Sequence, residues 1–380
     1  MRVLVSAGDA SGDGHAADVV RALAARRPGT RFVGLGGSAL EAAGVEIRVP
    51  LRDVAIGGLV EVLGHVPRVF RAWRTLEAIA RDETPDLALL VDAPDLHLPL
   101  ARRLRRAGVP VLYYVSPQVW AWRSRRIGTI AARADRLAVI FPFEVDVFAG
   151  TGLRVDFVGH PLVDRLSAVR ARWQRETARA ALGLPADRPV LVLLPGSRRN
   201  EVRRMLPLHL AIAARLRARQ PGLVTVLALA PTVSAADVEP LPRGVDVRVV
   251  EGRGYPAMVA ADLALTKPGT TTLELCLLGT PFAVAGRAHP VSAAVMRRLV
   301  QLPSWTLPNL LAGAPVVPEF LQRQARPERV AAALEELLAG PARALQLERL
   351  AGVSRRLGPG GAAERTAQIA EEMMRGRVAA

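Results

Sequence analysis

Two carboxylates follow a short apolar run in the sequence Val91-Asp92-Ala93-Pro94-Asp95. The run Leu87 to Val91 is typical of a buried parallel strand, so the pair should lie at that strand's carboxyl end, where open α/β sheets bind ligands. Partial burial there raises the pKa of a carboxyl group and suits it to accept a proton. We predict that Asp92 is a general base. Asp95 could take that role instead or cap the next helix, and no further ligand cluster supports a metal pair.

A second candidate site is the stretch Tyr114-Val-Ser-Pro-Gln-Val-Trp-Ala-Trp-Arg-Ser-Arg-Arg126, which holds two of the chain's five tryptophans. It follows the apolar run Val109 to Val115, which predicts another buried strand, and Ser116-Pro117 can begin a helix. The flat rings of Trp120 and Trp122 could contact a ligand there, and the arginines could bind phosphate. Two core tryptophans followed by a solvated basic helix would produce the same pattern.

Two loops in the second half of the chain could bind an anion. Leu194-Pro-Gly-Ser-Arg-Arg199 joins a strand to a helix, and its backbone N–H groups and Arg198 suit a phosphate. Thr266-Lys-Pro-Gly-Thr-Thr-Thr-Leu-Glu274 combines a glycine turn, three hydroxyls and a helix N-terminus, which can hold a diphosphate, while Glu274 can accept from ribose hydroxyls. Either loop could instead simply cap a helix.

Lys267 is the one lysine among 51 basic residues, so a compact ammonium group has been kept in an arginine-rich chain. Its survival by chance is an equally good explanation. The stretch from Ser6 to His15 is rich in small residues that allow close approach of a ligand, although a tight turn also explains it. Its glycines do not match G-x-G-x-x-G, and the chain has no G-x-x-x-x-G-K-[ST] loop.

Composition bounds the class of protein. At 380 residues the chain is too long for one ordinary core, so we expect two globular domains. The single cysteine, Cys276, excludes a disulfide framework and a cysteine-based metal site. The net charge of +16 favours acidic partners, in part through codon bias towards arginine. No zinc finger, RNP-like stretch or basic zipper is present, so phosphorylated substrates and a membrane surface are favoured over nucleic acid.

The elements that must position these residues alternate along the chain. Strands are expected at Val3–Ser6, Arg31–Gly34, Leu87–Val91, Val109–Val115, Leu137–Ile140, Val155–Val158, Val190–Leu194, Val224–Ala230, Val245–Val250, Leu263–Thr266 and Phe282–Ala285. Helices are expected at Gly12–Arg26, Val66–Arg81, Leu98–Ala107, after Pro142, at Asn200–Arg219, Thr270–Leu278 and from Pro327 onwards. This alternation predicts two Rossmann-like α/β halves with a cleft between them.

The segment from Ile56 to Trp73 is rich in apolar residues interleaved with His65 and arginines, and it reads as an amphipathic element at a membrane surface. A core-facing helix is equally consistent with the spacing. The chain begins with a strand-like run rather than a signal peptide, and no apolar run approaches the roughly 18 residues needed to span a bilayer. We therefore expect a cytoplasmic protein, soluble or peripheral.

Taken together, these motifs resemble the lipid-A-disaccharide synthase family of inverting GT-B glycosyltransferases. The resemblance runs through most of the chain and is carried by Ser6-Ala-Gly-Asp-Ala-Ser-Gly-Asp13, Gly58-Leu-Val-Glu-Val-Leu63, Val91-Asp-Ala-Pro-Asp95, Tyr114-Val-Ser-Pro-Gln-Val-Trp-Ala-Trp-Arg123, Phe157-Val-Gly-His-Pro161, Leu194-Pro-Gly-Ser-Arg198, Gly269-Thr-Thr-Thr-Leu-Glu274 and Leu307-Pro-Asn-Leu-Leu-Ala-Gly313. This chain departs from the family's usual residues at Asp9, at Lys267-Pro268, and at Ala288-His289-Pro290.

The resemblance implies a GT-B-like fold of two Rossmann-like domains facing a cleft, with C-terminal helices. Expected boundaries are 1–164, joined by about 346–380, for the acceptor and membrane-facing domain, and 165–345 for the UDP-sugar domain. The family's essential aspartate falls on Asp92. The expected UDP-binding residues are Gly196, Ser197, Arg198, Lys267, Gly269, Thr270, Thr271, Glu274 and Asn309. Those on the acceptor side are Ser11, Asp13, His15, Glu61, Asp95, Trp120 and Trp122, and those expected to contact acyl chains or membrane are Leu59, Val62, Leu63, Val66, Phe70 and Trp73.

The implied reaction condenses UDP-2,3-diacylglucosamine with 2,3-diacylglucosamine 1-phosphate (lipid X), releasing UDP, in lipid A biosynthesis. No cofactor or metal is implied. The implied location is the inner face of the inner membrane, on an anionic surface, and a homodimer is compatible with the sequence. Two alternatives remain: a related GT-B enzyme acting on a soluble UDP-sugar, such as an epimerase, and a non-enzymatic membrane-binding protein with the same fold.

Overall fold

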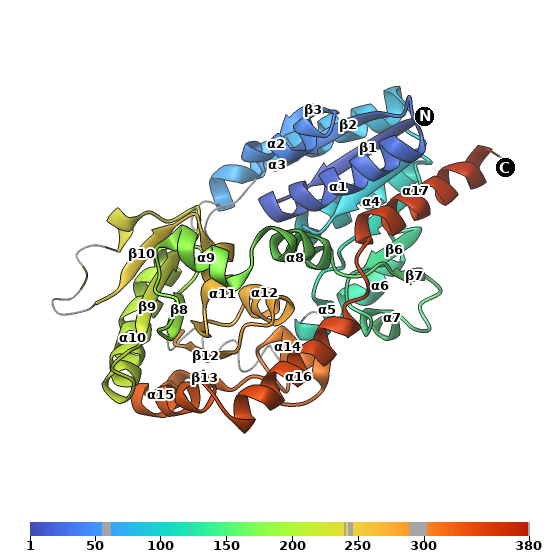
Figure 1. The fold of residues 1–380 in the computed structure, drawn as a ribbon. Coiled ribbons are helices and arrows are strands. Elements are labelled where there is room, and N and C mark those ends of the chain that lie inside the picture. Colours follow the sequence, from blue (N-terminus) through green and yellow to red (C-terminus); the bar gives the residue numbers. More distant parts are fainter. Residues whose placement is uncertain (55–61, 123, 239–240, 242–245, 289–301, 379–380) are drawn as a thin grey trace. The chain divides into compact units, whose positions relative to one another are not determined.

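The computed structural model describes residues 1–54, 62–122, 124–238, 241, 246–288 and 302–378. These residues form two compact units: Met1–Pro161 with Leu357–Ala380, and Leu162–Arg356. Each unit is a parallel sheet flanked by helices (Figure 1). The return to the first unit falls at Leu357 rather than near residue 346. The reason is that α16 (Pro341–Arg356) packs on α12 and α14, and Gln346 bonds both the N–H and the carbonyl of Phe282.

The first unit contains a seven-stranded sheet of order β3-β2-β1-β4-β5-β6-β7. Its strands are β1 (Arg2–Ala7), β2 (Arg31–Gly36), β3 (Val45–Pro50), β4 (Leu87–Val91), β5 (Val111–Tyr114), β6 (Arg136–Val139) and β7 (Arg154–Phe157). Its helices are α1 (Ala10–Arg26), α2 (Ser38–Ala42), α3 (Val62–Asp82), α4 (Pro94–Arg106), α5 (Val119–Trp122), α6 (Arg126–Ala131), α7 (Glu144–Val147) and α17 (Ala362–Val378). The strands β1, β4 and β5 are neighbours, so their carboxyl ends meet at one edge of the sheet.

The second unit contains a six-stranded sheet of order β10-β9-β8-β11-β12-β13. Its strands are β8 (Val190–Leu194), β9 (Val224–Leu229), β10 (Arg248–Glu251), β11 (Leu263–Thr266), β12 (Phe282–Gly286) and β13 (Glu319–Leu321). Its helices are α8 (Pro161–Arg172), which begins at the unit boundary, α9 (Arg175–Leu182), α10 (Arg199–Arg219), α11 (Gly254–Ala260), α12 (Thr271–Leu278), α14 (Leu307–Ala312), α15 (Pro327–Glu336) and α16.

The core of each unit lies between its sheet and helices. The central strands β4 and β8 are fully buried, with the sequences LALLV and VLVLL, and burial on both faces is why they read as continuous apolar runs. Helix α17 lies along α1 and closes the first unit (Figure 1). Its Glu371 receives ion pairs from Arg26 and Arg27, and Arg136 of β6 pairs with Glu372. No helix within the described ranges combines the length and apolar character needed to cross a membrane.

Candidate active site

Asp92 follows β4 directly, and the backbone turns there in a way that residues with a Cβ rarely adopt. Asp92 and Ala93 have φ values of 50° and 44°, in the left-handed region. The turn brings Ala93 against Gly8, where an added Cβ would lie 2.2 Å from that of Ala93. Gly8, in the small-residue stretch after β1, is therefore needed for close packing. The structure thus places the end of β1 beside Asp92.

The carboxyl group of Asp92 has the properties of a general base. Burial raises its pKa to about 6, the negative charge of Asp9 adds to the rise, and a hydrogen bond from the backbone of Ala93 opposes it. A group with this pKa is ionised at neutral pH yet still a useful proton acceptor. Asp95, by contrast, is exposed and pairs with Arg126 at 2.5 Å. Nor does Asp95 cap α4, whose N-cap residue is Ala93. The geometry favours Asp92 over Asp95.

The other residues expected on the acceptor side have different surroundings. Asp9, which was not among the expected acceptor-side residues, caps α1 next to them by accepting from the N–H of Gly12 at 2.6 Å. Ser11 is exposed and lies 3.3 Å from His15 Nε2. Asp13 is buried, and its two oxygens accept from Gly37 at 2.6 Å and Ala39 at 2.9 Å.

Asp13 therefore fixes the start of α2, and the expectation that it contacts the acceptor is not supported. Glu61 lies outside the described residues. So do Leu59 and the side chain of Trp122.

Trp120 lies beside a buried carboxyl group that the sequence analysis missed. Its indole N–H donates to Glu144 Oε1 at 3.3 Å, while Phe141 N–H donates to Oε2 at 3.0 Å. Glu144 is 1% exposed, and burial raises its pKa to about 7. The Trp120 ring also packs edge to face with Phe141 and Phe143, with ring centroids 6.4 and 5.1 Å apart. The run Phe-Pro-Phe-Glu just after a buried strand was the signal available in the sequence.

The apolar segment before residue 73 divides between surface and core. Val62, Leu63 and Val66 fall in α3, but their side chains lie outside the described part of the chain. Phe70 is 49% exposed and carries Arg74 over its ring. Trp73 packs against the core and donates its indole N–H to Leu96 O at 2.9 Å. Trp73 therefore belongs to the core face of α3, and lipid contact by this residue is not supported.

In the second unit, the loops after β8 and β11 are joined through Glu201. Gly196 has a φ of 144°, and an added Cβ would lie 2.8 Å from the side chain of Glu201, so both the backbone conformation and the space favour glycine here. Glu201 accepts from Ser197 N–H at 3.2 Å and pairs with Lys267 Nζ at 3.4 Å. Lys267 Nζ also donates to Pro268 O at 3.1 Å and lies close to Gly269. The ion pair of Lys267 with Glu201 therefore links the two loops. Arg198 is 82% exposed at the start of α10.

The remaining UDP-binding candidates differ in their freedom to bind a ligand. Thr270 is exposed before α12, while Thr271 bonds the carboxyl group of Glu274. Glu274 also accepts from Tyr255 at 2.9 Å, and burial raises its pKa.

Asn309 is 6% exposed, and its amide is occupied within the unit. It donates to Val317 O and Glu319, and accepts from Val316 and Val317 N–H at 2.8 Å. In this structure Asn309 holds a loop in place rather than presenting its amide to a ligand.

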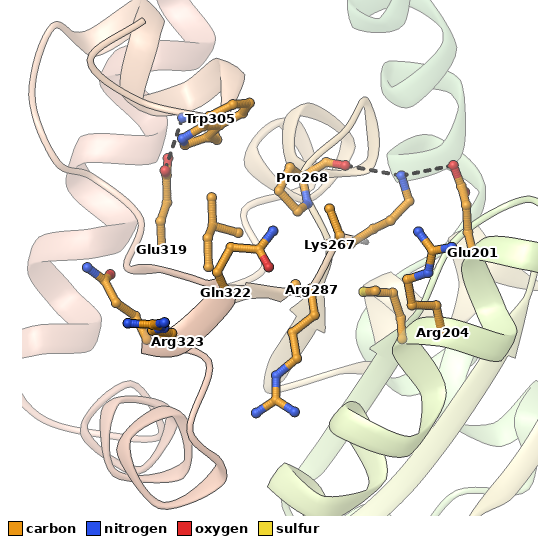
Figure 2. Close-up of a pocket in the computed structure, with 14 residues that line it drawn as sticks. Glu201, Arg204, Lys267, Pro268, Arg287, Trp305, Glu319, Gln322 and Arg323 are labelled. Atoms are coloured by element: carbon orange, nitrogen blue, oxygen red, sulfur yellow. Dashed lines mark hydrogen bonds and ion pairs between the residues drawn. The ribbon is translucent and has the colours of Figure 1, made fainter. Parts of the chain in front are cut away.

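A cavity of about 1180 Å³ opens at the carboxyl ends of β11, β12 and β13. Figure 2 shows Trp305 and Glu319 on one side, Lys267 and Glu201 on the other, and Gln322 between them. Glu319 accepts from the N–H groups of Trp305 and Thr306, so backbone donors in the cavity lining stabilise its negative charge. The cationic residues of the lining are Arg204, Lys267, Arg287 and Arg323. This wall suits an anionic ligand, and Lys267 is the sequence-predicted residue that lines it.

Comparison with known proteins shows which family this chain belongs to. The chain matches the family described as lipid-A-disaccharide synthetase over residues 3–371. It is 42% identical over 376 residues to the lipid-A-disaccharide synthase of Geobacter sulfurreducens, covering 98% of this chain and 97% of the relative. It is 43% identical over 378 residues to that of Anaeromyxobacter dehalogenans strain 2CP-C, covering 98% of each.

Solved structures show the same fold at low identity. UDP-GlcNAc 2-epimerase from Neisseria meningitidis, bound to UDP-GlcNAc, aligns with a TM-score of 0.67 and 14% identity over 98% of this chain and 99% of that one. The calicheamicin glycosyltransferase CalG4 aligns with a TM-score of 0.64 and 17% identity over 100% and 99%. The two parallel-sheet domains are thus of the GT-B class, and the protein is a glycosyltransferase. The chain belongs to the lipid-A-disaccharide synthase family, and its function is the synthesis of the lipid A disaccharide.

The influence of Asp9 on Asp92 can be tested directly. Asp9→Asn removes the neighbouring negative charge but keeps an N-cap for α1, so the pKa of Asp92 should fall from about 6. Because burial is the larger cause, the pKa should stay above its ordinary value of 3.8. Carbon-13 NMR titration of labelled aspartate carboxyls measures both effects. An unchanged pKa in the variant would contradict the proposed coupling.

Proposed function

We propose that this enzyme transfers the glucosamine unit of UDP-2,3-diacylglucosamine to the 6-hydroxyl of 2,3-diacylglucosamine 1-phosphate. The acceptor oxygen forms a bond to the donor's anomeric carbon from the face opposite UDP, while the bond from that carbon to the diphosphate breaks. The hydroxyl proton passes to Asp92, and UDP leaves with the electron pair. The products are the β-1,6-linked disaccharide 1-phosphate and UDP. The observation that carries this proposal is the partly buried Asp92, with a raised pKa, at the end of β4.

The pH dependence of the reaction rate follows from the direction in which the pKa of Asp92 is shifted. The base must be ionised to accept a proton, and its pKa in the folded enzyme is about 6. The rate should therefore be full above this value and fall as the pH drops through it. His97 has its pKa lowered to about 4 by burial, so it stays neutral over this range. We assign the step near pH 6 to Asp92, and a step from Glu144, whose pKa burial raises to about 7, would lie at higher pH.

The second unit supplies positive charge for the departing diphosphate. We assign this role to Arg198, Lys267 and the backbone N–H groups at the start of α12, which stabilise charge as it develops on the leaving group. The structural similarity to an epimerase bound to UDP-GlcNAc supports the binding of a UDP-sugar in a fold of this kind. Side chains and a helix N-terminus would then supply the positive charge, and we expect turnover to continue in EDTA.

Because both proposed substrates carry acyl chains, the enzyme must act at a membrane surface. We propose that α3 contacts the anionic surface of the inner membrane through its exposed Phe70 and neighbouring arginines. Arg74 over the Phe70 ring places a cation next to an apolar group, an arrangement suited to the boundary between headgroups and acyl chains. On the other side of α3, Ala72, Leu76 and Ile79 pack into the core.

Replacing Asp92 with Asn tests the assignment of the base. The substitution keeps the shape of the side chain but cannot accept the proton, so turnover should fall by about 10² to 10⁴-fold while UDP binding stays near normal. Asp95→Asn, at an exposed neighbour, is the matched control and should keep most of the activity. Full turnover by Asp92→Asn would show that another group is the base.

Replacing Lys267 tests the diphosphate site. Lys267→Ala removes one charge-assisted contact, so the Kd for UDP should rise about tenfold. Lys267→Arg keeps the charge but places a planar fork where the ammonium meets Glu201 and Pro268, so it should restore binding only in part. Calorimetry with UDP measures both variants. Equal affinity of the Ala variant and the native enzyme would mean that Lys267 does not contact the diphosphate.

Membrane contact is tested with vesicles of phosphatidylglycerol and phosphatidylethanolamine. Phe70→Glu should weaken sedimentation with these vesicles, because it places a negative charge on the contacting face. Leu345→Glu is the matched control: Leu345 is 46% exposed, but it lies on α16 of the second unit. The proposed surface would be refuted by equal loss in both variants or by loss in neither.

A further inference from the structure

The backbone of Asp92 and Ala93 needs outside support to keep its conformation. Both residues carry a Cβ, and both have φ values in the left-handed region. Such residues persist there only when the surrounding structure holds them. The turn sets where the Asp92 side chain leaves the sheet, so whatever holds the turn also fixes the direction of the carboxyl group.

Two fully buried side chains hold this turn through one atom. Tyr113 Oη donates to the carbonyl oxygen of Asp92 at 2.6 Å, and His97 Nδ1 lies 2.7 Å from the same oxygen. Tyr113 and His97 are each 0% exposed, so water does not compete for these bonds. The N–H of Asp92 continues the sheet by donating to Tyr114 O at 3.0 Å. Both polar backbone groups of Asp92 are therefore fixed.

The tautomer of His97 follows from its partners. A carbonyl oxygen can only accept, so Nδ1 carries the proton and donates to Asp92. Nε2 must then accept, and its partner is the hydroxyl of Ser6, at 2.8 Å. Burial lowers the pKa of His97 to about 4, so this neutral form is kept at neutral pH. The chain of bonds runs from Ser6 in β1, through His97 in α4, to Asp92 after β4.

The supports come from both strands that flank β4. Tyr113 lies in β5, Ser6 lies in β1, and both strands pair directly with β4. The rings of His97 and Tyr113 meet edge to face, with centroids 6.3 Å apart. Each ring thus limits the movement of the other. The carbonyl of Asp92 is therefore held by side chains from β5 and α4 rather than from a loop.

We propose that Tyr113 and His97 are positioning residues for catalysis, which direct the Asp92 carboxyl group by binding its carbonyl oxygen. This inference rests on the proposed role of Asp92 as the base. In this proposal neither side chain contacts a substrate, and both act through Asp92. A displacement of about 1 Å at a catalytic group can cost about 10²-fold in rate, so such a support has a measurable effect.

Tyr113→Phe removes one donor and leaves the ring in place. The expected result is a fall in kcat of about 10- to 100-fold, with KM for both substrates within about threefold of native. Thr366→Val is the matched control, because it removes another fully buried hydroxyl that bonds a backbone carbonyl, Ala362 O at 2.8 Å, on α17 of the same unit. It should keep kcat near the native value. Thermal unfolding of both variants shows whether each is folded at the assay temperature.

His97 offers a rescue test. His97→Leu removes the donor, whereas the amide nitrogen of His97→Asn takes the place of Nδ1 and can still donate to Asp92. The Asn variant should therefore keep a higher kcat than the Leu variant, although both lose the bond to Ser6. A role in packing alone predicts the reverse order, because Leu fills an apolar site better than Asn.

The outcomes separate this inference from the proposed function. If Asp92→Asn abolishes turnover while Tyr113→Phe keeps kcat within twofold of native, the positioning role is overturned and the base assignment stands. If Asp92→Asn itself turns over normally, the base assignment fails and the positioning role fails with it. Equal losses in Tyr113→Phe and Thr366→Val, or losses confined to KM, would also overturn the positioning role.

Discussion

The account depends on a backbone turn in which two consecutive non-glycine residues, Asp92 and Ala93, are left-handed. Three neighbouring strands make this turn tenable. Tyr113 of β5 binds the carbonyl of Asp92, Ser6 of β1 orients His97 onto the same oxygen, and Gly8 leaves room for Ala93. Because Tyr113 and Ser6 lie on the strands that flank β4 and His97 lies on α4, the position of the carboxyl group is set by the order of the sheet and the packing of α4 on it.

The two units contribute different chemistry. Burial raises the pKa of carboxyl groups in both units, at Asp92 and Glu144 in the first and at Glu274 in the second, but of these only Asp92 is proposed to take up a proton. The second unit contains loops in which carboxylates are already paired. Glu201 joins two loops through Lys267, and Glu319 gathers backbone donors at the cavity wall. Such arrangements leave cationic side chains for an anionic ligand.

Most of the fold could be predicted from the sequence, because buried parallel strands are continuous apolar runs. The expected strands Leu87–Val91, Val190–Leu194 and Leu263–Thr266 have the bounds that the structure shows. Two edge strands, β3 and β13, were missed: β3 is only partly buried and β13 has three residues, so neither has an apolar run. The Val245–Val250 strand begins later, at Arg248.

Site residues could be predicted from the sequence where they directly follow a strand. They could not be predicted where their surroundings depend on residues distant in the sequence. Asp92 could be chosen from its place after an apolar run. The same reasoning could not show that the Asp13 carboxylate accepts hydrogen bonds from Gly37 and Ala39. Nor could it show that both the nitrogen and the oxygen of the Asn309 amide have partners within the protein. It also could not find Glu144, whose raised pKa follows from its burial beside Trp120.

The support for the base, from His97 and Tyr113, joins residues in different elements, and no local pattern marks it. A single sequence shows which residues precede or follow a strand. It does not show which buried polar groups from separate strands and helices meet at one atom, because that depends on the packing of the whole sheet.

The most direct test of the central claim is the pH dependence of product formation by the purified enzyme. The assay supplies UDP-2,3-diacylglucosamine and 2,3-diacylglucosamine 1-phosphate in EDTA, with products identified by mass spectrometry. The account predicts a disaccharide 1-phosphate and UDP, with kcat/KM falling as the pH drops through about 6. Absence of the disaccharide while UDP still binds, or a rate that does not fall at low pH, would contradict it.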